Sequence, residues 1–183
     1  MDKSYKVVFL DIDGVLNNKD TNEFTPEGFI GIDDGLLDRY AGFIHETGAK
    51  TVLVSSWKDE WSRFTPDCKE DGIYLDRKFR QKGIFIKDKT DESEKGSFYR
   101  GYAIGQFLQK YPMISDFVIL DDDEFDYADC PFLSGHIVHI DSYDGLTQEN
   151  IIQAKNILNS LEPLQVRIEN TDNQYTEKVV KKY

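Results

Sequence analysis

The hydrophobic residues of this chain fall into short uninterrupted runs, separated by stretches in which apolar positions recur every three or four residues. A short apolar run bounded by polar residues is typical of a strand that is buried on both faces of a sheet. The strands predicted on this basis cover residues 5–10, 51–54, 83–86 and 117–120. A fifth run, 136–140, alternates apolar and polar residues, which predicts a strand at or near a sheet edge.

Helices are predicted between these strands, because apolar residues there share one helical face. The predicted helices cover the stretch around Leu36–Ile44 and residues 76–81, 99–111 and 147–161. Asp33 or Asp34 is expected to cap the first helix and Gly48 to end it. Pro112 is expected to stop the third helix, and Thr147 is the expected N-cap of the last one.

The alternation of strands with helices indicates an α/β fold, a three-layer sandwich built on a mostly parallel, Rossmann-like sheet. Sheets of this kind bind ligands at the carboxyl ends of their strands. We expect one main domain over residues 1–162, followed by a C-terminal tail over residues 163–183. The tail is polar and charged, and its sequence leaves a strand, an arm or disorder open.

The composition restricts the partners of the protein. The formal net charge of −12 repels duplex nucleic acid and anionic membranes at long range, so tight binding of long nucleic acid is not expected. A small phosphorylated substrate stays compatible with this charge, because a bound cation can reverse the local field. No apolar run reaches the ~18 residues that a membrane span requires. The N-terminus shows no signal-peptide pattern, and Cys68 and Cys130 are expected to be free thiols, so the expected location is cytoplasmic.

Polar residues of a matching kind follow three of the predicted strands. Asp11 and Asp13 follow the first strand, Ser55 to Lys58 follow the second, and Asp121, Asp122 and Asp123 follow the third. If these strands are parallel neighbours, their ends bring several carboxylates together. Carboxylates packed closely raise the pKa of one another, and a divalent cation removes this conflict. Oxygen ligands select a hard ion, and Mg²⁺ fits best.

The order of these motifs resembles the haloacid dehalogenase (HAD) superfamily of phosphatases and phosphotransferases. The resemblance rests on DxDG at Asp11–Gly14, a hydrophobic strand ending in serine, a basic residue, and a hydrophobic strand ending in two aspartates, and it covers residues 6 to 126. The later segment "DSYDGLT" and its helix are similar to the closing segment of small capless members. Those members include the domains of RNA-repair proteins and the phosphatase half of polynucleotide kinase-phosphatases.

The resemblance implies a role for each matching residue at the end of the first strand. Asp11 would be the nucleophile that forms an aspartyl-phosphate, and Asp13 would be the general acid and later the base. Asp11 and the backbone carbonyl of Asp13 would also hold the Mg²⁺ ion. Gly14 would let the chain turn sharply after the strand.

The second and third strand ends receive implied roles in the same way. Ser55 would donate a hydrogen bond to a phosphoryl oxygen. Asp122 would complete the metal site, with Asp121 and Asp126 as ligands or supporting residues. Ser56 is the expected cap of a helix that begins near Trp57, and it is also a candidate substrate-binding residue. Asp123 and Glu124 fit a solvated loop, and Trp57 fits either the core or the border of the pocket.

The cation that contacts the nucleophile and the phosphate departs from the commonest pattern, which places a lysine before the third strand. Arg100, at the start of a predicted helix, is the favoured residue here, and Lys95 and Lys58 are the alternatives. Arginine would contact a phosphate in bidentate fashion, whereas lysine acts as a point charge.

Members of the superfamily often close the site with an inserted cap domain, for which this chain leaves little room. Residues 15–32 are long enough for a flap only. Residues 58–99 must also supply a sheet crossover, so they add at most a small lid. We therefore expect minimal or no cap, and an open site that suits a bulky substrate or one covered by a partner subunit.

The sequence thus predicts a Mg²⁺-dependent phosphomonoester hydrolase that acts through an aspartyl-phosphate. Its phosphorylated substrate is not identified by the sequence, and a nucleotide or a polynucleotide 3′-phosphate is one option. The alternative is a HAD-like module that binds metal and phosphate with weak or absent catalysis. The oligomeric state does not follow from the sequence.

Overall fold

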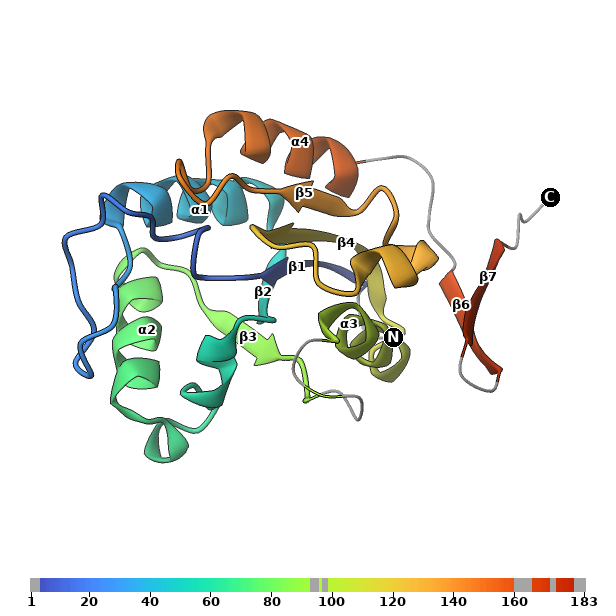
Figure 1. Ribbon diagram of the computed structural model, residues 1–183, viewed down its shortest axis with the longest axis horizontal. Coiled ribbons are helices and arrows are strands. Elements are labelled where there is room, and N and C mark those ends of the chain that lie inside the picture. The colour runs from blue at the N-terminus through green and yellow to red at the C-terminus, as the bar shows by residue number, and fades with distance from the viewer. Residues whose placement is uncertain (1–3, 93–95, 97–98, 160–165, 172–173, 180–183) are drawn as a thin grey trace.

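A five-stranded parallel sheet forms the centre of the protein (Figure 1). The computed structural model describes residues 4–92, 96, 99–159, 166–171 and 174–179. The strand order is β3-β2-β1-β4-β5. The strands are β1 (Tyr5–Leu10), β2 (Lys50–Leu53), β3 (Ile86–Lys89), β4 (Ile114–Asp121) and β5 (Ile137–His139). The predicted α/β fold with a parallel, Rossmann-like sheet is confirmed, and β5 lies at an edge, as expected.

Helices cover both faces of the sheet and give the predicted three layers. They are α1 (Asp34–Thr47), α2 (Glu70–Gln81), α3 (Arg100–Lys110) and α4 (Gln148–Leu158). Alternate residues along β1 and β4 enter two separate cores: Val8 packs with α1, α2 and α4, whereas Phe9 packs with α3. Figure 1 shows α1 and α4 side by side on one face, with α3 on the other.

The caps of two helices follow the sequence closely. Asp33 caps α1 and accepts a hydrogen bond from the Leu36 N–H at 2.9 Å, and Gly48 ends this helix in the left-handed conformation. Thr147 and Asn150 form a capping box at the start of α4. These local signals therefore place the helix ends as predicted.

Three elements begin at least three residues away from the predicted position, and one of them is β4, which begins at Ile114 rather than at residue 117. β3 begins at Ile86 rather than at residue 83, because pairing with β2 starts between Thr51 and Ile86. The preceding Ile84 is buried in the core and Phe85 is exposed, so the apolar character of this run reflects packing rather than strand formation. α2 begins at Glu70 rather than at residue 76, with acidic residues in its first turn, where they favour the helix dipole.

Residues 15–32, the predicted flap, form a loop that is tied to α2. An antiparallel bridge joins Phe24 and Ile30 within the loop. Asp71 of α2 accepts hydrogen bonds from the Thr25 hydroxyl at 2.9 Å and from the Glu27 N–H at 3.1 Å. Farther along α2, Lys78 and the Tyr74 hydroxyl both contact Glu23, at 2.6 and 2.8 Å. The loop is therefore fixed at several points along one helix.

The segment 58–99, considered above as a small lid, contributes α2 and β3 to the body of the protein. Leu75 and Phe79 of α2 are fully buried in the core that this helix shares with α1. In the predicted tail, β6 (Val166–Thr171) and β7 (Gln174–Val179) form a separate antiparallel pair. Among the helices of the described residues, none has the length and apolar character needed to cross a membrane.

Candidate active site

The carboxyl ends of three neighbouring strands meet at one edge of the sheet. Leu10 of β1 pairs with Leu53 of β2 on one side and with Leu120 of β4 on the other. The pairing continues one residue further, since the Asp11 N–H donates to the Leu120 carbonyl and the Val54 N–H donates to the Leu10 carbonyl. The residues after each strand are thereby held side by side.

Three carboxylates gather at these ends and form a candidate metal centre. Asp11, Asp121 and Asp122 each offer an oxygen, and these oxygens lie within 4.8 Å of one another. Burial, and then the neighbouring carboxylates of Asp11 and Asp121, raise the pKa of Asp122 to about 6. Burial and the Asp11 carboxylate also raise the pKa of Asp121. The cluster therefore carries an electrostatic strain that a cation would relieve.

One atom of this cluster fits a bound cation particularly well. Asp11 is 3% exposed, and its Oδ1 is buried with no hydrogen-bond partner among the described residues. A buried carboxylate oxygen without a partner is costly. A set of oxygen ligands with an orphaned oxygen suits a hard ion such as Mg²⁺.

Arg100 contacts two carboxylates of this cluster, including that of the nucleophile candidate Asp11. Its Nη1 contacts Asp11 Oδ2 at 3.0 Å and Asp121 Oδ2 at 2.8 Å, and its guanidinium lies 3.9 Å from the centre of the Phe125 ring. Although burial opposes its charge, the carboxylates of Asp11 and Asp121 raise the pKa of Arg100 above its ordinary value. Among the described residues, Arg100 is the cation that contacts Asp11, and Lys95 lies outside that range.

Asp126 holds the helix that carries Arg100. Its two carboxylate oxygens accept hydrogen bonds from the N–H groups of Gly101, at 2.6 Å, and Tyr102, at 3.0 Å, in the first turn of α3. The cluster of potential ligands does not include Asp126. Of the two roles expected for Asp126, this geometry favours the supporting one, in which it caps α3 from a distant loop.

Asp121 has a further partner that the sequence did not single out. The Tyr127 hydroxyl donates to Asp121 Oδ2 at 2.6 Å, and the Asp123 N–H donates to Oδ1 at 3.0 Å. Burial, followed by the Asp121 carboxylate, raises the pKa of Tyr127 well above its ordinary value, so the phenol stays a donor. These contacts fix Asp121 beside Arg100.

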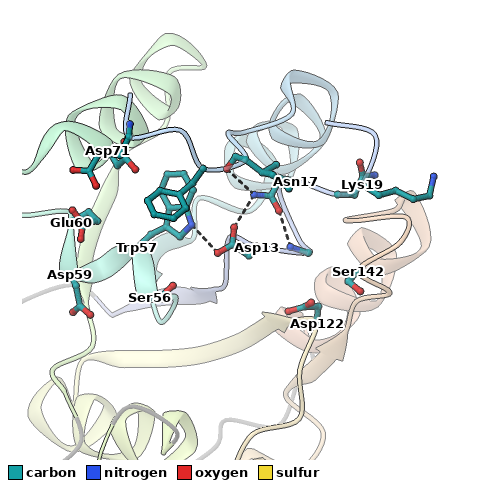
Figure 2. Close-up of a pocket in the computed structure, with 15 residues that line it drawn as sticks. Asp13, Asn17, Lys19, Ser56, Trp57, Asp59, Glu60, Asp71, Asp122 and Ser142 are labelled. Atoms are coloured by element: carbon teal, nitrogen blue, oxygen red, sulfur yellow. Dashed lines mark hydrogen bonds between the residues drawn. The ribbon is translucent and has the colours of Figure 1, made fainter. Parts of the chain in front are cut away.

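The Asp13 carboxylate is held by two donors (Figure 2). Asn17 Nδ2 donates to one oxygen at 2.9 Å, and the Trp57 indole Nε1 donates to the other at 3.0 Å. The Gly14 N–H in turn donates to Asn17 Oδ1 at 2.9 Å, which fixes the amide. Trp57 is thus both a buried core residue and a border of the site. The role of Asn17 was not recognised from the sequence.

A 3₁₀ helix, η1 (Ser56–Asp59), follows β2. It contains Ser56 and Lys58, and Ser55 immediately precedes it. Ser55 caps this helix and accepts from the Trp57 N–H at 3.4 Å, so the prediction that Ser56 is the cap is wrong. The cap falls on Ser55 because it is the residue with extended backbone angles, whereas Ser56 is already helical. Burial, and secondarily Arg100, lower the pKa of Lys58, whose side chain is largely buried.

A pocket of about 720 Å³ opens above Asp13 and Asp122 (Figure 2). Its lining includes Gly14, Ser56 and Trp57 from the strand ends and Phe29 and Ile30 from the flap. Asp11, Ser55 and Arg100 are not part of this lining. The acidic centre therefore forms the inner part of the site, and the pocket leads from Asp13 to the flap.

A parallel α/β sheet with this acidic centre at its strand ends is the arrangement expected of a protein of the HAD superfamily. Residues 7–151, well over half of the chain, match the model of a family described as the HAD domain in Swiss Army Knife RNA repair proteins. The chain belongs to this family. Membership indicates a hydrolase of the phosphatase type. A search of curated proteins found no match.

Proposed function

We propose that the protein is a Mg²⁺-dependent phosphomonoester hydrolase that forms an aspartyl-phosphate, an acyl phosphate, on Asp11. The observation that carries the proposal is the environment of the Asp11 carboxylate. One of its oxygens contacts Arg100 at 3.0 Å, and the other is buried beside Asp121 and Asp122 with no hydrogen-bond partner in the described part of the chain. This carboxylate is fixed and oriented, as a nucleophile must be.

The residues that would hold Mg²⁺ are Asp11, Asp122 and the backbone carbonyl of Asp13, with Asp121 beside them. When bound, the ion neutralises charge on the carboxylates and the phosphate, so that the two anions can approach. Arg100 lies next to Asp11 and supplies further positive charge for the phosphoryl oxygens. Ser55 is fully buried next to this centre and serves as a hydrogen-bond donor to the phosphate.

The reaction consists of two displacements at phosphorus. An Asp11 oxygen attacks phosphorus, the bond to the leaving oxygen breaks, and a proton from Asp13 passes to that oxygen. Asp13 then accepts a proton from water while the water oxygen attacks the same phosphorus. The bond between Asp11 and phosphorus breaks, and inorganic phosphate is released. Asn17 and Trp57 orient Asp13 for both proton transfers.

The test is hydrolysis of an aryl phosphate with Mg²⁺ by the wild type and by Asp11→Asn. We expect the substitution to abolish turnover, since the amide is not a nucleophile. Asp38→Asn on the exposed face of α1 is a matched control that keeps activity. Full activity of Asp11→Asn would overturn the mechanism. Binding of Mg²⁺ and phosphate by the wild type without turnover on a broad panel of esters would favour the regulatory module instead.

A polynucleotide 3′-phosphate is a second candidate substrate, favoured by the description of the matching family as a domain of RNA repair proteins. The net charge of −12 argues against tight binding of long polymers. Comparing an oligonucleotide 3′-phosphate with nucleotides and sugar phosphates decides between the candidates. The ratio of their kcat/KM values is the measurement.

A further inference from the structure

The pocket above Asp13 receives the part of the substrate that leaves with the oxygen. Asp13, the proposed proton donor, lines this pocket, and a proton donor must lie within hydrogen-bond distance of the leaving oxygen. The groups proposed to bind the phosphate, Ser55 and Arg100, lie outside its lining. Resting on the proposed function, this geometry makes the pocket the leaving-group site.

The charged side chains that line this pocket are mostly acidic. Beyond Asp13 and Asp122, four acidic residues line it, namely Glu27, Asp59, Glu60 and Asp71. Lys19 is the only cation among the described residues of the lining, and it is paired with Asp20 at 2.7 Å and placed over the Tyr143 ring. Anionic groups entering the pocket would therefore meet an excess of acidic side chains in its lining.

The four acids differ in how they are compensated. Glu60 pairs with Lys69 at 2.8 Å, and Asp71 accepts hydrogen bonds from the uncharged donors of Thr25 and Glu27. Within the described part of the chain, neither Glu27 nor Asp59 forms an ion pair, and both are exposed at the pocket. Lys69 interacts electrostatically with both acids and Lys58 interacts with Asp59, but neither lysine is part of the lining, so Glu27 and Asp59 present their negative charge to whatever occupies the pocket.

The remaining wall is apolar and aromatic. Phe29 is 64% exposed although its backbone is fixed, because its N–H donates to the Thr25 hydroxyl and its carbonyl accepts from the Thr25 N–H. Ile30 and the Trp57 ring complete this wall. A large exposed apolar side chain on a fixed backbone, in the lining of the same pocket as Asp13, favours contact with a flat apolar ligand.

We propose that the substrate is a small phosphomonoester with an apolar or aromatic leaving group that carries no negative charge besides the phosphate removed. Glu27 and Asp59 repel further anionic groups of the substrate, and Phe29 contacts the apolar face of the leaving group. A polynucleotide end, whose leaving group carries additional phosphates, is disfavoured by the same residues.

The test uses phenyl phosphates that differ in one para substituent, a neutral carboxamide or an anionic carboxylate. For the wild type we expect kcat/KM to favour the carboxamide by roughly tenfold at low salt, with a smaller ratio at high salt. The double variant Glu27→Gln/Asp59→Asn should lower this ratio by at least about threefold, since it removes two of the repelling charges. Comparing the ratio between variants cancels differences in the intrinsic reactivity of the two esters.

The double variant Asp67→Asn/Asp129→Asn is the matched control, because it changes the net charge equally at exposed positions outside the pocket, and it should keep the wild-type ratio. For the aromatic wall, Phe29→Ala should raise KM for the carboxamide ester several-fold. Phe24→Ala, on the same loop and 63% exposed but not part of the lining, should leave KM unchanged.

Equal kcat/KM for the two esters in the wild type would overturn the charge exclusion while leaving the phosphatase activity intact. So would an oligonucleotide 3′-phosphate that reacts at least as efficiently as the carboxamide ester. An unchanged KM in Phe29→Ala would overturn the aromatic contact. Absence of turnover with every ester would overturn the proposed function, and the inference would fall with it.

Discussion

A Cβ atom at Gly14 would lie 2.2 Å from Oδ2 of Asp122, so the backbone after β1 and the metal-ligand candidate after β4 share one space. Gly14 also has a φ of +71°, which costs other residues about 1–2 kcal/mol. The close approach of Asp122 to this backbone therefore requires glycine at position 14. The DxDG motif meets this requirement through its last residue.

Gly14→Ala should displace Asp122 and weaken Mg²⁺ binding at least about tenfold, in addition to the cost of the positive φ. Gly48→Ala is the control, because Gly48 has a similar φ of +66° with nothing within 4 Å of its Cβ position. We expect it to lower stability without affecting the metal. Isothermal titration with Mg²⁺ and chemical denaturation measure both effects, and equal Mg²⁺ affinity in the two variants would contradict this explanation.

Arg100→Ala should lower kcat/KM by about 100-fold or more, as expected when a charge that faces the phosphate is removed. It should also destabilise the metal-free protein by about 3–5 kcal/mol, since two buried carboxylates lose their partner. Lys58→Met should have a smaller effect on kcat, because Arg100 rather than Lys58 contacts Asp11 among the described residues. Steady-state kinetics and urea denaturation test this order, and a larger loss of kcat in Lys58→Met would reverse it.

Asp126→Ala should cost about 1 kcal/mol of stability through the lost helix cap and should lower kcat/KM by displacing Arg100. Its Mg²⁺ affinity should stay at the wild-type value, since Asp126 caps α3 rather than joining the acidic cluster. Asp33→Ala removes the cap of α1 and serves as the comparison, with a similar loss of stability and unchanged activity. A large drop in Mg²⁺ affinity in Asp126→Ala would restore the ligand role.

The stability of the metal-free protein should fall as pH rises from 4 toward 7. The pKa of Asp122 in the folded chain is about 6, against an ordinary value of 3.8, so the folded state binds more protons within this window. The contribution is fully present below the ordinary pKa and is lost as pH rises through the folded-state pKa. Mg²⁺ requires the ionised carboxylate, and its stabilising effect should therefore grow above about pH 6.

Thermal unfolding across this pH range, with EDTA or with Mg²⁺, measures both trends. Asp122→Asn cannot ionise at this position, so it should flatten the EDTA curve and reduce the Mg²⁺ effect. A wild-type protein whose stability without metal increases steadily from pH 4 to 7 would contradict the assignment.

The sequence was most informative where a local pattern determines the structure. Tyr5–Leu10 is apolar on both faces and becomes a central strand with the predicted bounds, and Asp33 and Gly48 are local stop signals for a helix. The gathering of Asp11, Asp121 and Asp122 followed from the parallel topology. By contrast, the capping of α3 by Asp126 joins positions 25 residues apart through tertiary packing, which no local pattern encodes.

Side-chain partners within the site were the least predictable part. Trp57 was expected to be either core or pocket border, and it is both, because its ring is buried while its N–H reaches Asp13. Tyr127 reads as an ordinary aromatic residue, and only the fold places its hydroxyl on Asp121. The start of β3 was misplaced because burial of Ile84 and strand pairing of Ile86 produce the same apolar run.

The contacts between the flap and α2 separate substrate recognition from the chemical reaction, although both involve the same pocket. Glu23 and Thr25 attach the loop to Tyr74, Lys78 and Asp71, whereas the nucleophile and its neighbours belong to the central strands. The turn bearing Glu27 and Phe29 can therefore be exchanged for another sequence, in evolution or by grafting, as long as its contacts with α2 are kept. New preferences could arise in this way while the phosphorus chemistry below stays untouched.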